Sequence, residues 1–336
     1  MTGWFVYQGS GAPDPGRIDS LPEPPPWRAF DAEPTPYDVP EIDSATTRRL
    51  GSSAPLLPVQ DSKALQLVNA ALYLRRPMLV TGDPGAGKST LAHSLAYELG
   101  LGRVLEWPVV SRTELKDGLY TYDAIGRLHD AQLDRGGADG ISEDVGRYVK
   151  LGPLGTALIA ADRPRVLLVD ELDKSDIDLP NDLLNVLEEG RFAIPELERI
   201  ADRRAEVDVL TDDGRRVKVK NGVVRCKAFP VVVMTSNRER EFPLPLLRRC
   251  VTLDLQAPRE QRLAALVQAH FGEGSYEANR DIVELFTAAE ADGALRPTDQ
   301  LLNALFLTQH AVRGQSERQR EDLADLLMQP LDHGLR

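Results

Sequence analysis

Apolar positions along the middle of the chain switch between helical spacing and short continuous runs. Segment 62–74 (SKALQLVNAALYL) carries apolar residues at helical intervals, and 77–82 (PMLVTG) is a short apolar run that ends in glycine. Leucines then recur every four residues over 91–99, and Gly100 supplies a helix stop. This pattern predicts a helix, followed by a strand, a glycine-rich loop and a second helix.

Four further apolar runs have the length and composition of buried strands. Buried runs that alternate with helical segments are typical of a mostly parallel sheet covered by helices on both faces. One such helix is expected at LPNDLLNVLEEG, with Asp178 as its N-cap and Gly190 as its stop. The four runs are VLEWPVV (104–110), RVLLVD (165–170), PVVVMTSN (230–237) and VTLDL (251–255).

Two segments interrupt this alternation. EVDVL (206–210) and RRVKVK (215–220) alternate apolar and charged residues around Asp213-Gly214, which predicts a β-hairpin within an insertion at about 195–228. The other interruption, at about 117–150, is rich in glycine and charge, and we expect loops with little core there. These insertions belong to an α/β domain predicted over 59–257.

The two ends of the chain differ from this centre. Residues 258–336 show only helical patterns, at about 259–271, 276–291, 297–312 and 316–328, and predict a small all-α domain. Residues 1–58 form the expected N-terminal arm. Of the 24 prolines, 11 lie in the first 60 residues, where acidic residues outnumber basic ones by eight to four. Such a segment forms little regular structure.

The arm also carries five aromatic residues, which a solvated linker would lack. We therefore expect it to pack on the body of the protein or on a neighbouring subunit, and to contribute nothing to the ligand site. The aromatic residues are Trp4, Phe5, Tyr7, Trp27 and Phe30.

Composition narrows the class of protein. A formal net charge of −12 argues against a protein whose main role is to coat nucleic acid. There is no charged-then-apolar leader at Met1 and no apolar run of membrane-spanning length, so we expect a cytoplasmic protein without membrane insertion. The two cysteines, Cys226 and Cys250, are expected to be buried apolar residues rather than a bridge or a metal pair.

The glycine-rich turn after 77–82 matches the pattern GxxxxGK[ST]. Its glycines allow backbone N–H groups to surround phosphate oxygens, Lys88 reaches the outer phosphates, and the Ser89 hydroxyl binds Mg²⁺. A chance glycine-rich turn is the alternative, but the position between a strand and an amphipathic helix favours the phosphate loop. It predicts a P-loop NTPase with an α/β/α three-layer fold and a five-stranded parallel sheet. The candidate ATP-binding residues are Gly82, Asp83, Pro84, Gly85, Ala86, Gly87, Lys88, Ser89 and Thr90.

Two carboxylates follow the buried strand at 165–170. In open α/β sheets, ligands bind at the carboxyl edge, which is where Asp170 and Glu171 are expected. Asp170 would hold Mg²⁺ together with Ser89, and Glu171 would polarise the attacking water. A lone Asp-Glu pair is commonly a solvated turn, but a phosphate loop requires an acidic partner of this kind.

Three polar residues later in the chain are weaker candidates for catalysis. Asn237 ends a predicted strand and could orient the water, although strands often end in asparagine for turn reasons. Arg248 and Arg249 stand together before the strand at 251–255. Either could reach the γ-phosphate bound by a neighbouring subunit, or both could be a solvated surface pair.

Together these segments resemble the AAA+ ATPases. GDPGAGKST, LLVDELDK, MTSNRERE and LRRC occur in the order of the Walker A, Walker B, sensor 1 and arginine-finger regions. GPLG, DLPNDLLNVLEEGRFAIPEL and the predicted hairpin look like the MoxR branch. The resemblance covers about 60–315. It departs modestly at Asp83 and Ser89, where the family often has Glu and Thr.

The resemblance implies a hexameric ring that hydrolyses ATP with Mg²⁺ at subunit interfaces and remodels a protein client in a chaperone-like way. The clients of this family often contain a von Willebrand A domain, so the resemblance implies such a client here. By position, Arg249 resembles the finger with Arg248 a close second, and Arg296 looks like the sensor 2 arginine of the helical lid domain at 258–336.

A rival interpretation is an ATP-dependent nucleic-acid motor or loader, because one predicted hairpin arm is basic. On an acidic chain, such a run is more often the protection of an edge strand. A scaffold that binds nucleotide without hydrolysis is disfavoured, because Glu171 is present. The basic residues of this arm are Arg215, Arg216, Lys218 and Lys220.

Overall fold

A five-stranded parallel sheet forms the centre of the computed structural model, which describes residues 3–51, 62–133, 144–256, 260–291, 298–310 and 317–328. Every neighbouring pair of strands is parallel, in the order β11-β1-β10-β5-β2. The predicted five-stranded parallel sheet is therefore confirmed. Its strands are β1 (Met78–Gly82), β2 (Leu105–Pro108), β5 (Val166–Asp170), β10 (Val231–Ser236) and β11 (Val251–Leu255).

Helices cover both faces of this sheet, because its inner strands have apolar side chains on both sides. Val233 of β10 packs in a cluster with helices α2 (Ser62–Leu74) and α3 (Lys88–Glu98). Its neighbour Val232 packs in the opposite cluster, which includes helix α7 (Leu179–Glu189). Adjacent residues of a strand point to opposite faces of the sheet. The uninterrupted apolar run of β10 therefore supplies buried side chains to the helical layers on both faces.

The ends of α7 agree only in part with the sequence. Gly190 ends the helix in the left-handed conformation, with φ of 59°, as predicted. Asp178 occupies the N-cap position, as predicted, but its side chain accepts no capping hydrogen bond. Instead Asp176 Oδ1 accepts from the backbone N–H of Leu179 at 3.3 Å.

A second sheet has six strands in the order β3-β4-β7-β8-β9-β6. The predicted hairpin is its centre, where β7 and β8 pair antiparallel with Val207 opposite Val219. Burial alternates along β8, so one face packs inward and the other is exposed. The strands are β3 (Tyr120–Tyr122), β4 (Val149–Leu151), β6 (Arg191–Ala193), β7 (Glu206–Leu210), β8 (Arg216–Lys220) and β9 (Val223–Arg225).

The expectation of loops with little core at 117–150 was wrong for the described part of that segment. It contains β3, β4 and helix α5 (Ala124–Leu133), and it follows the start of helix α4 (Leu115–Leu119). Tyr120 and Leu151 are buried and lie opposite each other in the β3–β4 pair. The strands YTY and VKL are only three residues long and bury one face, so each shows a single alternation of apolar and polar residues. Among the surrounding glycines and charged residues, that alternation is too short to indicate a strand.

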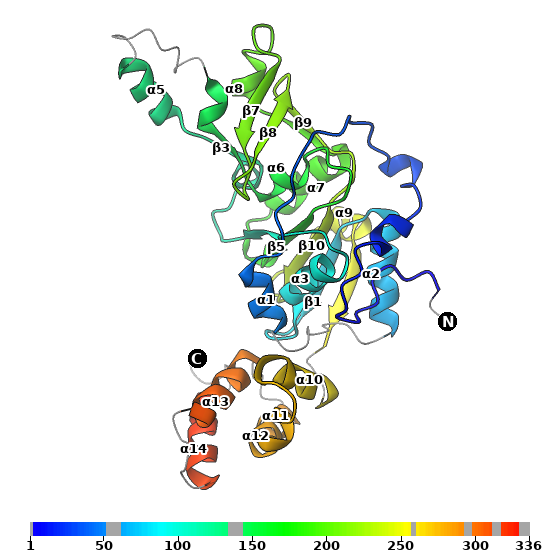
Figure 1. Cartoon of the computed structure of the whole chain (residues 1–336), viewed down its shortest axis with the longest axis vertical. Coiled ribbons are helices and arrows are strands. Elements are labelled where there is room, and N and C mark those ends of the chain that lie inside the picture. Colours follow the sequence, from blue (N-terminus) through cyan, green and yellow to red (C-terminus); the bar gives the residue numbers. More distant parts are fainter. Residues whose placement is uncertain are drawn as a thin grey trace.

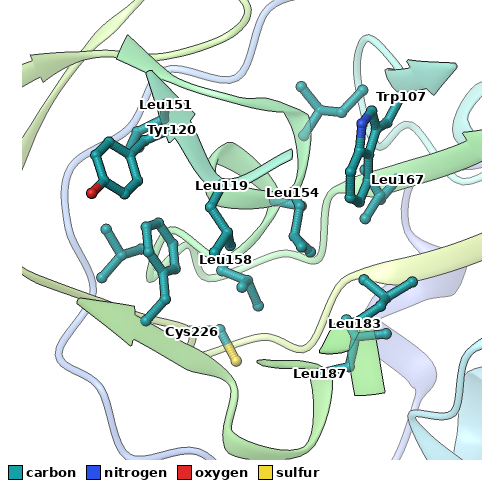
Figure 2. Packing of buried hydrophobic residues seen from close by; sticks show 14 of the residues in the cluster. Trp107, Leu119, Tyr120, Leu151, Leu154, Leu158, Leu167, Leu183, Leu187 and Cys226 are labelled. Carbon is teal, nitrogen blue, oxygen red and sulfur yellow. The ribbon is translucent and has the colours of Figure 1, made fainter. Parts of the chain in front are cut away.

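The two sheets share one hydrophobic cluster, part of which is drawn in Figure 2. Trp107 and Leu167 come from the parallel sheet, and Tyr120 comes from the second sheet. Leu154 of helix α6 (Pro153–Ala157) lies between these groups. Cys226 belongs to the same cluster and, like Cys250, is a free buried cysteine, as predicted.

The N-terminal arm crosses the body and packs through some of its aromatic residues. Tyr7 is fully buried, and its hydroxyl shares a hydrogen bond of 2.8 Å with Ser94 of α3. Phe30 stacks on Phe229, with 5.8 Å between ring centroids. Trp27 is 75% exposed, so the arm does not bury every aromatic side chain. Its short helices are η1 (Arg17–Ser20), η2 (Pro26–Arg28) and α1 (Ser44–Leu50).

The C-terminal helices form a separate hydrophobic cluster that includes Leu263, Phe286 and Leu305. Figure 1 shows this helical group and the β7–β8 hairpin at opposite ends of the molecule. None of the helices in the described ranges combines the length and apolar character that a membrane crossing requires. The helices are α10 (Glu260–Phe271), α11 (Ser275–Ala278), α12 (Arg280–Ala291), α13 (Thr298–His310) and α14 (Glu317–Leu327), and α9 (Leu244–Arg249) precedes β11.

Candidate nucleotide-binding site

A cavity of about 350 Å³ opens at the carboxyl edge of the parallel sheet, where the loops after β1, β5 and β10 meet. Helices α1 and α10 and the start of α13 also contribute to its walls. Its lining residues are Arg49, Pro84, Gly85, Gly87, Lys88, Ser89, Thr90, Asp170, Glu171, Thr235, Asn237, Leu266 and Thr298.

The loop between β1 and α3 adopts a conformation that requires its glycines. Gly85 and Gly87 have φ of 80° and 84°, and Gly87 immediately precedes α3. At Gly82, an added Cβ would lie 2.2 Å from the carbonyl oxygen of Leu255. Six of the nine predicted ATP-binding residues of this loop line the cavity, while Gly82, Asp83 and Ala86 support it from outside.

Lys88 is held inside the loop. Its Nζ donates to the carbonyl oxygens of Gly82 at 2.8 Å and Asp83 at 2.9 Å. Burial lowers the pKa of Lys88, and the nearby carboxylate of Asp170 opposes that shift. The ammonium group is thus desolvated and lacks a direct carboxylate hydrogen bond among the contacts of the described residues. An anion in the cavity would restore charge pairing.

Ser89 and Asp170 meet across the cavity. Ser89 Oγ donates to Asp170 Oδ1 at 2.7 Å, which joins the start of α3 to the end of β5. Thr235 of β10 donates to the same carboxylate oxygen at 2.6 Å and accepts from the N–H of Glu171 at 2.9 Å. Thr235 is almost fully buried. It was missed from the sequence, although a threonine inside the run VVVMTSN is the kind of signal that could have indicated it.

Glu171 follows β5 in a backbone conformation that is unusual for a residue with a side chain. Its φ is 60°, in the left-handed region. Strained residues of this kind cluster at functional sites. The carboxylate accepts from Lys174 Nζ at 2.7 Å, and 44% of the side chain is exposed. The structure therefore places Glu171 at the cavity with a side chain free to exchange its partner.

Asn237 also lies at the cavity. Its backbone N–H donates to Asp173 Oδ2 at 2.8 Å, and the N–H of Glu239 donates to the same oxygen at 3.1 Å. Asp173 is buried and lies in the turn after Glu171. It thereby ties the loop after β10 to the loop after β5, a positioning role that sequence reasoning did not assign.

The two candidate arginine fingers lie far from this cavity in the same subunit. Both precede Val251, which pairs with Met78 at the amino end of β1, whereas the cavity lies at the carboxyl end. Arg249 forms an ion pair with Glu188 of α7. Arg248 is exposed, and neither arginine lines the cavity.

The helical group reaches the phosphate loop through α13. Thr298 Oγ1, at the start of that helix, donates to the carbonyl oxygen of Gly85 at 3.0 Å. Leu266 of α10 adds an apolar wall to the cavity. The predicted sensor residue, Arg296, lies outside the described residues.

One lining residue contradicts the expectation that the arm contributes nothing to the site. Arg49 of α1 lies at the cavity, and its Nη2 donates to Glu106 Oε2 at 2.9 Å. Arg49 lies in the proline-rich arm, 33 residues before Gly82, and nothing in the sequence around it predicts this contact.

This sheet, its phosphate loop and the acidic residues at its carboxyl edge define a P-loop nucleotide-binding protein of the AAA+ type. Residues 77–250 match the family described as AAA domain (dynein-related subfamily). The match spans more than half of the chain, and the protein belongs to that family.

Other comparisons describe similarity alone. Among solved structures, the chain resembles NtrX from Brucella abortus in complex with ATP, at 15% identity and a TM-score of 0.33. The similarity covers 79% of this chain and 50% of that one, so the chain spans about half the length of that protein. The comparison with curated proteins finds no match.

Proposed function

We propose that this protein binds ATP with Mg²⁺ in the cavity at the carboxyl edge of the parallel sheet and hydrolyses it. The observation that carries the proposal is the convergence of three groups on one cavity. They are the glycine loop with its buried Lys88, the Ser89–Asp170 pair, and Glu171. Family membership supports the ATPase class.

In the proposed complex, Lys88 exchanges its two carbonyl partners for phosphate oxygens, which carry more negative charge. Ser89 Oγ and Asp170 Oδ1 are hard oxygen ligands that lie 2.7 Å apart, a donor set that fits Mg²⁺. When bound, Mg²⁺ would neutralise charge on the phosphates. Thr235 holds the Asp170 carboxylate in place.

Hydrolysis needs a base and an oriented water. We assign the base to Glu171, which would leave Lys174 and accept a proton as the water oxygen bonds to the γ-phosphorus and the bond to the leaving ADP oxygen breaks. We assign water orientation to Asn237, which lies at the same cavity.

We further propose a homo-oligomeric ring, with six subunits by resemblance to AAA+ ATPases of the MoxR branch. Arg249, or Arg248, would approach the γ-phosphate of the next subunit, since neither reaches its own cavity. Arg296 would report nucleotide state to the helical domain. The ring would remodel a protein client, with a von Willebrand A domain as a candidate feature. The formal net charge of −12 favours a protein client over nucleic acid, although the hairpin carries Lys218 and Lys220.

The test is a comparison of ATP binding and phosphate release in three proteins. Lys88→Ala should weaken ATP binding by about 100-fold or more, because a desolvated charged contact with the phosphates is lost. Glu171→Gln should bind ATP normally and lose turnover by about 10² to 10⁴.

Lys218→Ala, an exposed lysine on the hairpin, is the matched control and should behave as wild type in both assays. Equal loss of binding in Lys88→Ala and Glu171→Gln would contradict the separate roles given to them. Because Glu171→Gln should stall with ATP bound, co-purification with this form is the way to capture the client.

A further inference from the structure

Helix α1 of the N-terminal arm is fastened to the helix that follows the phosphate loop. Figure 1 shows α1 beside α3, and the two helices are in contact. Thr46 Oγ1 and His93 Nδ1 share a hydrogen bond of 2.9 Å, and both side chains are fully buried. Asp43 caps the start of α1 by accepting from the N–H of Thr46 at 3.0 Å. The position of α1 is therefore set by specific contacts rather than by loose packing.

The other end of α1 touches the helical domain. Gly51 ends α1 with φ of 87°, and an added Cβ there would lie 2.7 Å from the carbonyl oxygen of Ala269 on α10. The same helix α10 supplies Leu266 to the cavity wall. Thus α1 contacts both the helix that presents Lys88 and helix α10 of the C-terminal helical group.

Arg49 of α1 lines the same cavity as Ser89 and Asp170. Its partner Glu106 lies on β2 opposite Leu168, two residues before Asp170 on β5. The Arg49 and Glu106 side chains are 38% and 33% exposed. An ion pair this accessible contributes little, so the guanidinium can exchange Glu106 for a stronger anion.

The charges that line the cavity also favour a second cation beside Lys88 as a partner for a bound polyphosphate. Among the lining residues, the cations are Lys88 and Arg49, and the anions are Asp170 and Glu171. A polyphosphate adds negative charge beside those carboxylates even when Mg²⁺ accompanies it. Guanidinium groups bind phosphate with two parallel hydrogen bonds, a geometry that an ammonium group lacks.

We propose that Arg49 is a second phosphate-binding side chain, supplied by the arm of the same subunit, which leaves Glu106 and binds the outer phosphates of the nucleotide. The inference rests on the proposed ATP site and deepens it. It makes α1 part of the binding site, so that nucleotide binding and docking of the arm stabilise each other.

The first experiment measures ATP and ADP affinity by calorimetry for the full chain and for Arg49→Ala, Arg49→Lys and Arg48→Ala. Arg49→Ala should weaken ATP binding about tenfold and ADP binding less, because a charge-assisted contact with the outer phosphates is lost. Arg49→Lys should fall between wild type and Arg49→Ala. Arg48 is exposed, does not line the cavity and provides the matched control.

The second experiment predicts tighter ATP binding, an outcome that a misfolded variant cannot produce. Glu106→Gln frees Arg49 from its partner and should tighten ATP binding by about threefold. The gain should vanish in the double variant Glu106→Gln/Arg49→Ala, while circular dichroism verifies that each protein is folded.

Unchanged ATP affinity in Arg49→Ala, an equal loss in Arg48→Ala, or a gain in Glu106→Gln that survives removal of Arg49 would overturn the assignment. Failure of the ATP site itself has a different signature. In that case the wild-type chain would not bind ATP, or Lys88→Ala would bind it as tightly as wild type.

Discussion

The two sheets of this protein share a hydrophobic cluster, yet they are built differently. Strand β10 of the parallel sheet is buried at every position, whereas β8 of the six-stranded sheet alternates between exposed and buried residues. A strand that is buried on both faces carries polar side chains mainly where it ends. Because parallel strands end at the same edge of the sheet, these polar side chains come close together there. A two-faced sheet instead displays polar side chains along its length. The parallel sheet therefore brings its polar side chains together at one site, whereas the six-stranded sheet exposes them over one face.

The largest expected effect tests whether the parallel sheet of one subunit holds a complete site. If Arg249 acts on the next subunit, Arg249→Ala should lower turnover on the order of 10³-fold while its own cavity still binds ATP. Lys88→Ala has the opposite defect, because its own cavity cannot bind ATP while its Arg249 remains available to the next subunit. When the two inactive proteins are mixed and exchange subunits, a fraction of ATPase activity should return.

The same mixing experiment with Arg248→Ala distinguishes the two arginines. No recovery despite demonstrated mixed assembly would exclude action across the interface. Full activity of Arg249→Ala alone would move the role to Arg248 or remove it from the pair.

The second prediction concerns a buried ionisable group in the layer over the parallel sheet. Burial lowers the pKa of His93 to about 4, and the charge of Arg49 adds to that shift while Asp43 and Asp170 oppose it. The folded protein then binds fewer protons than the unfolded chain between pH 6.5 and 4, so stability falls as pH drops through that window.

The contribution of His93 should be about 2 kcal/mol at pH 5, since that pH lies about 1.5 units below the ordinary pKa and one unit corresponds to about 1.4 kcal/mol. Urea unfolding of wild type and His93→Gln at pH 7.5 and pH 5 measures it. The difference in pH dependence between the two proteins isolates His93, and identical pH dependence would refute the assigned cause.

The third prediction compares adjacent positions in the two sheets. Val232→Ala and Val233→Ala in β10 should each lower the free energy of unfolding by about 2 kcal/mol, because both faces are buried. In β8, Val219→Ala should cost a similar amount, but Lys218→Ala should stay within about 0.5 kcal/mol. Denaturant titration checks this, and a large loss in Lys218→Ala would show that the exposed face is packed.

The smallest expected effect concerns the exposed face of the hairpin. Removing Lys218 and Lys220 together should leave stability within about 0.5 kcal/mol and basal ATPase unchanged, since each pairs only with an exposed carboxylate. ATPase activity should not respond to DNA. Stimulation by DNA at low salt that disappears steeply as salt rises, and that the double variant lacks, would support the nucleic-acid motor instead.

Sequence by itself determined the parallel sheet and the centre of the candidate site. The phosphate loop, from Gly82 to Ser89, is contiguous, and the left-handed backbone conformations of Gly85 and Gly87 are local. The acidic pair follows directly from a buried run. In each case, the residues that act together are neighbours in the chain, so composition and spacing are sufficient evidence.

Tertiary structure alone decided the remaining contacts. Strands β3 and β4 escaped prediction because β4 joins the rest of its sheet through β7, about 60 residues later, at Lys150 opposite Leu210. Thr235 reaches Asp170 only because β10 pairs with β5. Arg49 enters the cavity only because α1 packs on α3. Such contacts depend on which buried surfaces pack against each other, and the spacing of residues along the chain does not predict that packing.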